Sequence, residues 1–331
     1  MLKLGYKASA EQFGPRELVD FSVLAEDHAF DSVWVSDHFS PWRHTDGHSP
    51  FAFALMGALG ERTKRVEIGT SVLTPTFRYH PSIVAQAMGT LGAMYPGRIL
   101  LGVGTGEGMN EVTATGVEWP GTSERFARLK EAIGLMKKLW TEELVTFEGQ
   151  FYKTYKATIY DRPEKPVPVF VAAAGPAAAK LAGREADGFI CTSGKNWELY
   201  RETLIPAVEE GEAQANREKG YVERLIEIKV SFDTDRERAM EDTKIWAALA
   251  LAPEDKVGID NPKDMEAKAR LAEPYAHRRW IVSNDPDEVV AAIQPYLDLG
   301  FTHLVFHHPG DDQARFIKQF SEMVLPKLRS K

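Results

Sequence analysis

The sequence predicts an α/β fold, and most simply a (β/α)8 barrel, because eight short apolar runs alternate with helical patterns along its 331 residues. Several runs are apolar throughout, as expected for parallel strands that are buried on both faces. A doubly wound open sheet is the alternative that this pattern leaves open. The strand candidates are residues 2–6, 32–37, 66–73, 99–104, 167–175, 188–193, 226–232 and 303–308.

Helices are predicted between these strands because apolar residues recur there with a period near 3.6. Near the C-terminus, Asp285 is a predicted N-cap, Pro286 fits a first helical turn, and Glu288 is spaced to complete a capping box. The two clearest apolar stripes are Leu18, Phe21, Leu24 and Ala25, and Phe126, Leu129, Ile133, Met136 and Trp140.

Two intervals are too long for a simple barrel unit, so we expect insertions after strands four and seven. The first interval, between Glu107 and Val167, contains a segment that predicts a β-hairpin around Glu148-Gly149. The second, between Phe232 and Phe301, is predicted to be helical with a charged middle. Insertions after barrel strands tend to cover the mouth of the barrel or to build an interface.

Composition excludes several classes of protein. With 44% hydrophobic and 27% charged residues the chain is typical of a soluble globular protein, and its net charge of -8 argues against a nucleic-acid partner. No segment approaches the roughly 18 apolar residues of a membrane span, and the N-terminus lacks an apolar signal region. The one cysteine, Cys191, allows no internal disulfide and lies in an apolar run where packing is its expected role. We therefore expect a cytoplasmic protein without a membrane partner, folded as one domain over residues 1–331.

A glycine-rich turn follows the fourth strand candidate and carries Glu107. A carboxylate just past such a strand lies where α/β folds bind ligands, and the glycines allow another molecule to approach the backbone. The turn is not a dinucleotide fingerprint, because Glu107 stands where a glycine is needed, and no Gly-Lys-Ser/Thr of a P-loop follows. Glu107 is the first catalytic candidate, with a solvated glutamate in a tight turn as the alternative.

The second strand ends in Ser36-Asp37-His38, which places His38 at the predicted barrel mouth. An imidazole with an ordinary pKa near 6.5 can take or give a proton at neutral pH. Asp37 either contacts a ligand hydroxyl or amide or caps the turn. Trp42 either offers a flat wall for a ring or anchors the loop in the core.

Three cationic residues, Lys195, Lys256 and Arg279, follow late strands. Each alone is typical of a solvated surface, but two ammonium groups and a guanidinium together suit a phosphate monoester. We expect no metal site, because His307 and His308 are strand neighbours that point to opposite faces.

These segments resemble the luciferase-like deazaflavin and flavin oxidoreductases, and within them the enzymes that use coenzyme F420. The resemblance covers nearly the whole chain and implies a barrel and hydride transfer from C1 of glucose 6-phosphate to C5 of oxidised F420, giving 6-phosphogluconolactone. The alternatives are an F420-dependent dehydrogenase of another sugar phosphate or a secondary alcohol, an FMN-dependent monooxygenase, and a non-catalytic flavin-binding barrel. The matching segments are LKLGYKASAEQF, VSDHFSPWRH, GTSVLTPTFRYHP, GVGTGEGMNE, GFICTSGK, RRWIVSNDPDE and FTHLVFHHPG.

The same resemblance implies roles for individual residues. His38 acts on the proton of the sugar C1 hydroxyl, and Glu107, with a pKa raised by burial, exchanges a proton with N1 of the deazaflavin. Trp42 packs at the reacting centre, and Glu11 is a further carboxylate near the pocket.

The resemblance also implies binding residues, a cis peptide at Ser71-Val72 and a homodimer. Val257 is a departure, since it follows the clamp lysine where relatives are expected to carry histidine. The residues expected to line the cofactor are Asp37, Ser71, Val72, Thr74, Thr105, Gly106, Asn110, Ala174, Gly175, Ala177 and Ala178. Those expected to contact the sugar phosphate are Thr192, Lys195, Lys256 and Arg279.

Overall fold

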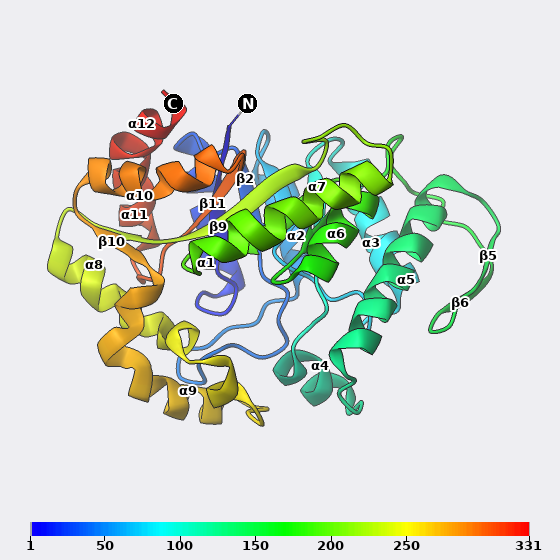
Figure 1. The fold of residues 1–331 in the computed structure, drawn as a ribbon, viewed down its shortest axis with the longest axis horizontal. Helices are drawn as coiled ribbons and strands as arrows, with labels where there is room; N and C mark the ends of the chain where they lie inside the picture. The colour runs from blue at the N-terminus through cyan, green and yellow to red at the C-terminus, as the bar shows by residue number, and fades with distance from the viewer. Residues whose placement is uncertain (1, 331) are drawn as a thin grey trace.

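Eight parallel strands close into a barrel in the computed structural model, which describes residues 2–330 (Figure 1). Each strand pairs with the next, and the eighth pairs with the first, so the predicted barrel is confirmed and the open sheet is wrong. In order around the barrel, the strands are β1 (Lys3–Ala8), β2 (Ser32–Val35), β3 (Glu67–Thr70), β4 (Ile99–Val103), β7 (Val169–Ala172), β8 (Gly188–Thr192), β9 (Glu223–Phe232) and β11 (His303–His307).

The barrel interior is filled by large apolar side chains, because alternate residues of each strand point inward. This filling separates the site at the mouth from the opposite end of the barrel. The inner cluster of the barrel consists of Trp34, Leu100, Phe170, Ile190, Leu225 and Val305. Val72 and Ala172 pack against this cluster.

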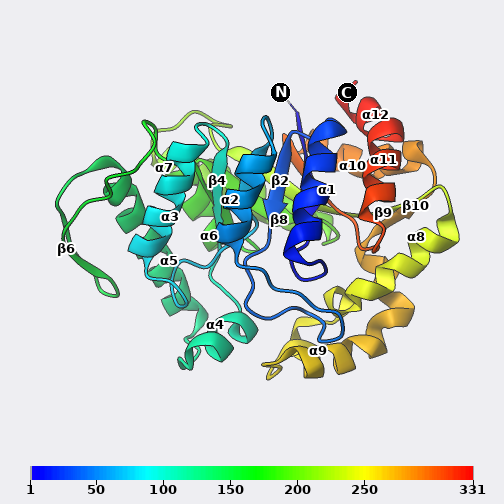
Figure 2. The ribbon, with the colours of Figure 1, turned by 180° about the vertical axis from the view of Figure 1, so that it is seen from behind.

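Helices cover the outside of the barrel, and Figure 2 shows α1, α2 and α3 side by side over the strands. The predicted stripe on α5 faces the core, where Leu129, Ile133, Met136 and Trp140 are buried. The α-helices of this layer are α1 (Pro15–Asp27), α2 (Ala52–Arg62), α3 (Pro81–Met94), α5 (Thr122–Thr141), α6 (Pro176–Glu185), α7 (Ile205–Gln214), α10 (Pro286–Asp298), α11 (Gln313–Met323) and α12 (Leu325–Arg329), with a π-helical turn η1 (Leu199–Leu204) before α7.

Both predicted insertions are confirmed. After β4 the chain forms α4 (Gly108–Thr115) and α5, and then a hairpin of β5 (Val145–Glu148) and β6 (Lys153–Ala157) that projects from the barrel (Figure 1). The insertion after β9 lies with α4 at the end where the barrel strands finish, the lower side of Figure 1. It comprises α8 (Arg236–Asp242), η2 (Thr243–Ala250), η3 (Pro253–Lys256), α9 (Pro262–Ala269), η4 (Arg270–Arg279) and β10 (Ile281–Ser283).

Two local expectations differ from the structure. Strand β9 begins at Glu223, three residues before the predicted start, because its polar first residues still pair with β8. Asp285 caps α10, but Glu288 does not complete a capping box. Its carboxylate instead accepts a hydrogen bond from Ser283 Oγ (2.6 Å), and the same hydroxyl accepts the Asp285 N–H at 2.9 Å.

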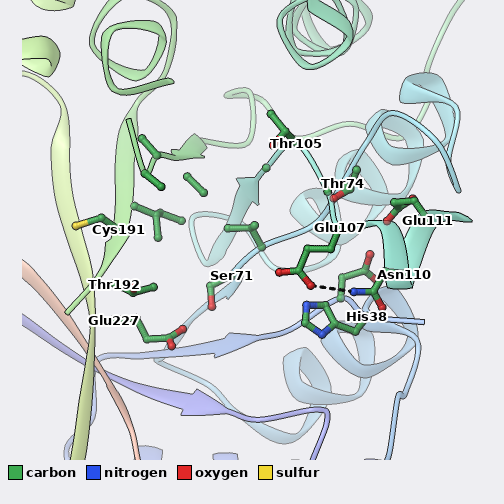
Figure 3. Close-up of a pocket in the computed structure, with 18 residues that line it drawn as sticks. His38, Ser71, Thr74, Thr105, Glu107, Asn110, Glu111, Cys191, Thr192 and Glu227 are labelled. Carbon is green, nitrogen blue, oxygen red and sulfur yellow. Dashed lines mark hydrogen bonds between the residues drawn. The ribbon is translucent and has the colours of Figure 1, made fainter. Parts of the chain in front are cut away.

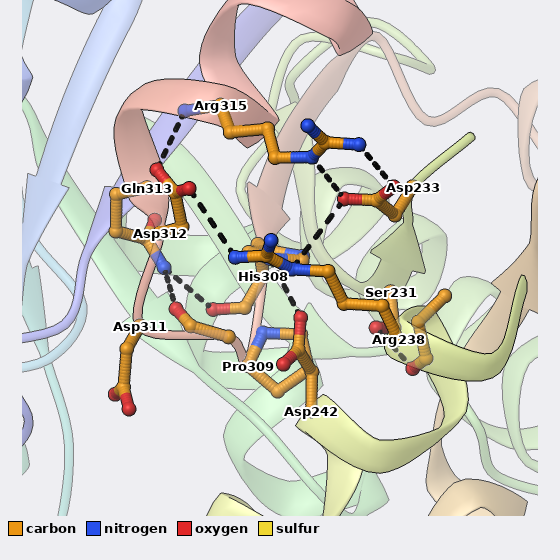
Figure 4. Close-up of polar contacts among 12 residues, drawn as sticks. Ser231, Asp233, Arg238, Asp242, His308, Pro309, Asp311, Asp312, Gln313 and Arg315 are labelled. Carbon is orange, nitrogen blue, oxygen red and sulfur yellow. Dashed lines mark hydrogen bonds and ion pairs between the residues drawn. The ribbon is translucent and has the colours of Figure 1, made fainter. Parts of the chain in front are cut away.

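A polar cluster outside the barrel ties the end of β9 to α8 and α11 (Figure 4). Arg315 donates to Asp233 at 2.6 and 2.9 Å, and His308 Nε2 lies 3.7 Å from Asp242. His307 instead contacts Lys229 at 2.8 Å inside the barrel, so the two histidines face opposite sides as predicted. Among residues 2–330, no helix has the length and apolar character needed to cross a membrane.

Candidate active site

A cavity of about 410 Å³ opens at the carboxyl ends of the barrel strands (Figure 3). It brings together most of the residues expected at the cofactor and several that sequence reasoning missed. The expected residues in its lining are Asp37, His38, Ser71, Val72, Thr74, Thr105, Gly106, Glu107, Asn110, Ala174 and Thr192. The others are Gly104, Glu111, Ala172, Ala173, Ile190, Cys191 and Glu227.

His38 and Glu11 form a buried acid–base pair at one side of this cavity. His38 Nδ1 lies 2.8 Å from Glu11 Oε1, in a close ion-pair contact that is not a well-aligned hydrogen bond. Burial lowers the pKa of His38, but the Glu11 and Glu107 carboxylates outweigh it and raise this pKa above its usual value. Burial of Glu11 is likewise outweighed by His38 and Lys7, which lower the pKa of its carboxyl to about 2. Glu11 therefore orients the imidazole and stays ionised beside it.

Glu107 lies near His38, at the N-cap position of α4 (Figure 3). Asn110 Nδ2 lies 3.4 Å from its carboxylate, and Asn110 Oδ1 accepts the backbone N–H groups of Phe39 and Ser40 at 2.9 and 3.0 Å. Asn110 thus connects the Glu107 turn to the loop that follows β2. The Glu107 side chain is exposed, which corrects the expectation of a buried carboxyl. The reason is that the turn ends at the open mouth of the barrel.

Asp37 is held by a polar network that the sequence did not reveal. Arg78 donates to Asp37 at 2.7 Å and to Glu111 at 3.1 Å, and the Tyr79 hydroxyl donates to Asp37 at 3.0 Å. The side chains of Arg78, Asp37 and Glu111 are largely buried, so the network stabilises the wall of the cavity between β2 and α4. Arg78 and Tyr79 lie in a loop without strand or helix periodicity, which left no signal for them.

The floor of the cavity is formed by Ser71 and Val72. Their peptide bond is cis, as the resemblance implied. Lys7, on β1, donates to Ser71 O at 2.7 Å and to Ser71 Oγ at 2.6 Å. Gly104 packs over this segment, since a Cβ there would lie 2.8 Å from Val72 Cγ2. Gly106 has φ +83, which only glycine adopts readily, and it forms the turn that leads to Glu107.

A charged cluster inside the barrel lies beside this floor and was also missed. Lys229 donates to Glu227 and contacts His307 Nδ1 at 2.8 Å, while Lys7 lies 3.5 Å from Glu227. Burial of Glu227 is outweighed by Lys229 and Lys7, which hold the pKa of its carboxyl well below the usual value. A signal was present: Glu227 and Lys229 alternate with isoleucine in β9, as inward-pointing residues do.

The three cationic candidates converge at the edge of the mouth. Burial lowers the pKa of Lys256, and the positive charges of Lys195 and Arg279 lower it further, against the opposing effect of Glu107. Burial and Arg279 lower the pKa of Lys195 in the same way. Arg279 donates to the carbonyl of Gly194. These cations repel one another, so a phosphate dianion bound among them would offset this unfavourable repulsion.

Trp42 contacts both His38 and Lys256. Its ring centroid is 6.4 Å from that of His38, and Lys256 Nζ lies 4.9 Å above the indole. Trp42 lines a neighbouring cavity instead of the main one. Glu11 lies behind His38, and Val257 is 80% exposed beside Lys256. Gly175, Ala177 and Ala178 lie outside the cavity lining, at the start of α6, where small residues leave the helix N-terminus accessible.

The cavity fits a flat ring with polar edges, such as the deazaflavin of F420. Apolar Val72, Ala172 and Ile190 offer a surface for a ring, while His38 and Glu107 offer hydrogen-bonding groups at its edge. The uncapped start of α6 next to Ala174 suits a phosphate group. No cluster of metal-ligating side chains occurs within the described part of the chain.

The chain is similar to known proteins over most of its length. A model of the family described as luciferase-like monooxygenase matches residues 2–303. An F420-dependent glucose-6-phosphate dehydrogenase of Nakamurella multipartita is 60% identical over 99% of this chain and 97% of its own length. One of Intrasporangium calvum is 59% identical over 99% of both chains. The structure of an F420-dependent secondary alcohol dehydrogenase with an F420-acetone adduct superposes with a TM-score of 0.93, at 35% identity and 99% coverage of both chains.

Proposed function

This chain belongs to the luciferase-like monooxygenase family, and we propose that within it the chain oxidises glucose 6-phosphate at C1 with coenzyme F420, forming 6-phosphogluconolactone. The observation that carries this proposal is that two proton-transfer candidates, His38 and Glu107, and three converging cations meet at one mouth of the barrel. The similar dehydrogenases from two bacteria support the same substrate and cofactor. The alternative of a neutral secondary alcohol leaves the three cations without a partner.

When bound, F420 supplies a deazaflavin ring whose C5 accepts a hydride. His38 Nε2 accepts the proton of the C1 hydroxyl as C1 becomes a carbonyl, because Glu11 occupies the Nδ1 side of the ring. Glu107, which lies near His38 at the start of α4, would exchange a proton with N1 of the bound ring. Lys195, Lys256 and Arg279, together with Thr192, bind the phosphate and so place C1 near His38.

We also propose that the expected cofactor residues at β2, β3, β4 and the start of α6 hold F420, and that the chain is one domain acting as a cytoplasmic homodimer. Exposed apolar side chains on and near the β5–β6 hairpin support an interface there, since Leu144, Tyr155 and Tyr160 are 63%, 77% and 88% exposed. Light scattering of the purified protein measures the oligomeric state.

The function is tested by following the absorbance of oxidised F420 when the protein receives F420 and glucose 6-phosphate. NADP and FMN serve as parallel acceptors, and glucose and isopropanol as parallel substrates. Bleaching that requires both F420 and glucose 6-phosphate is expected. Tight F420 binding without bleaching would contradict the substrate, and oxygen consumption with reduced FMN would favour a monooxygenase.

A further inference from the structure

The proposed phosphate-binding cations come from two parts of the molecule, with Lys195 in the loop after β8 and the other two in a later segment that has its own apolar cluster. Lys256 and Arg279 belong to residues 243–279, the segment from η2 to η4, which we term the cap. The cap has a small apolar cluster distinct from the main core, built on Ala247, Ala248, Leu251, Met265, Ala272 and Ala276 with Met109 of α4. His38 belongs to the loop after β2. The separation between the cations and the proton acceptor therefore depends on how the cap sits against this loop.

Glu266 joins the cap to that loop. Its carboxylate, on α9, accepts the backbone N–H of His44 at 3.0 Å, the N–H of Thr45 at 2.9 Å and the Thr45 hydroxyl at 2.9 Å. The side chain is only 15% exposed although the loop lies at the surface. The backbone hydrogen bond from Thr45 is the main reason that the pKa of Glu266 is lowered to about 2, so the contact persists at neutral pH.

Packing beside this contact is incomplete. A cavity of about 240 Å³ lies between the loop and the cap, lined by Trp42, Thr45 and Trp246 along with Glu266 itself. The hydrogen bonds of Glu266 and the packing of Trp42 on the cap's apolar cluster therefore hold the two parts together at this point. Trp42 precedes Thr45 by three residues and carries Lys256 Nζ 4.9 Å above its indole. A path of direct contacts thus runs from Glu266 through the loop and Trp42 to Lys256.

We propose that Glu266 is a positioning residue that sets the distance between Lys256 and His38, and so selects substrates by the separation of their phosphate from the reacting carbon. This inference rests on the proposed function. Glu266 touches neither substrate nor cofactor; it acts through the loop that carries Trp42. Loss of its carboxylate releases the loop from the cap, so that Lys256 no longer holds the phosphate at the distance that brings C1 to His38.

The test compares Glu266→Gln, which keeps the shape but cannot accept all three hydrogen bonds, with Glu266→Asp and with the control Glu273→Gln. Glu273 is an exposed acid of the cap that lines the same cavity. Glu266→Gln is expected to raise KM for glucose 6-phosphate by about tenfold, because the released loop no longer holds Lys256 at the distance that suits the phosphate. F420 affinity, from fluorescence titration, and the melting temperature are expected to stay near the unmodified values. Glu266→Asp restores part of the loss.

A double variant separates positioning from a general structural role. If Glu266 acts through Lys256, adding Glu266→Gln to Lys256→Ala changes KM little further, because the two effects are not additive. Fully additive effects, or a KM equal to that of Glu273→Gln, would overturn the inference.

Hydrogen–deuterium exchange tests the contact between Glu266 and the loop without using any substrate, so it separates failure of the Glu266 proposal from failure of the proposed function. Glu266→Gln is expected to speed exchange at residues 41–47 by about tenfold or more, whatever the substrate is. Unchanged exchange there overturns the Glu266 proposal. Faster exchange with no turnover of glucose 6-phosphate by the unmodified protein overturns the proposed substrate and leaves the loop contact standing.

Discussion

Replacing Glu11 with glutamine is expected to move the acid limb of turnover to lower pH. Sugar oxidation requires neutral His38, so kcat/KM rises as pH increases through the pKa of this imidazole. Burial lowers that pKa, but Glu11 and Glu107 raise it above 6.5, so the limb of the unmodified protein lies above pH 6.5. Glu11→Gln removes the larger of the two raising charges and leaves Glu107 in place.

The size of the shift follows from the geometry. His38 Nδ1 and Glu11 Oε1 are 2.8 Å apart, and the two side chains are 18% and 6% exposed, so solvent screens the pair weakly. Two unit charges 2.8 Å apart interact by about 6 kcal/mol at an effective dielectric constant of about 20, which is an upper limit on how strongly Glu11 stabilises the protonated imidazole. Changes in desolvation that accompany the substitution offset part of this energy, so we expect the acid limb of kcat/KM to move by about 1–2 pH units.

The assay is the initial rate of F420 reduction at subsaturating glucose 6-phosphate between about pH 5 and 9. Ser36→Ala is the matched control, because it removes the 2.9 Å hydrogen bond to Glu11 Oε2 without removing the charge. The Ser36→Ala limb is expected to stay near its original position. An acid limb that lies at the same pH in Glu11→Gln as in the unmodified protein would refute the reasoning.

Three other outcomes are expected. Glu107→Gln retains F420 binding by fluorescence titration but loses about 10²- to 10⁴-fold in turnover, since an amide cannot supply the proton; near-normal turnover contradicts that role. Arg279→Ala raises KM for glucose 6-phosphate by about tenfold or more and leaves F420 affinity unchanged; an unaltered saturation curve removes it from the clamp. Burial raises the pKa of Asp242 to about 6, with Asp233, Asp311 and Asp312 adding to the effect. The folded state therefore binds an extra proton between about pH 4 and 6, so stability falls as pH rises through that range. Asp242→Asn is expected to raise the free energy of unfolding by about 1 kcal/mol at pH 7, after allowance for solvent screening, and by little at pH 4, as measured by urea denaturation.

Local sequence signals explain the parts of the site that could be predicted. His38 and Glu107 each follow an apolar run, and in a parallel barrel every such strand end reaches the same mouth. No distinctive sequence pattern marked Glu11 as a site residue, and only the resemblance to known enzymes pointed to it. Arg78 and Glu111 hold the cavity wall from a loop and a short helix, where charged residues are too common to be diagnostic.

The sequence by itself determined the strand and helix order, the positions of both insertions and the chemistry of the site residues, because these depend on local periodicity and residue type. Tertiary structure alone decided that Glu107 is exposed, that Glu11 pairs with His38, and that Glu266 ties the cap to the loop of Thr45. These outcomes depend on contacts between residues far apart in the chain, such as the 221 positions that separate Glu266 from Thr45. Hydrophobic periodicity specifies which face of an element is buried, but not which polar groups meet when the faces close.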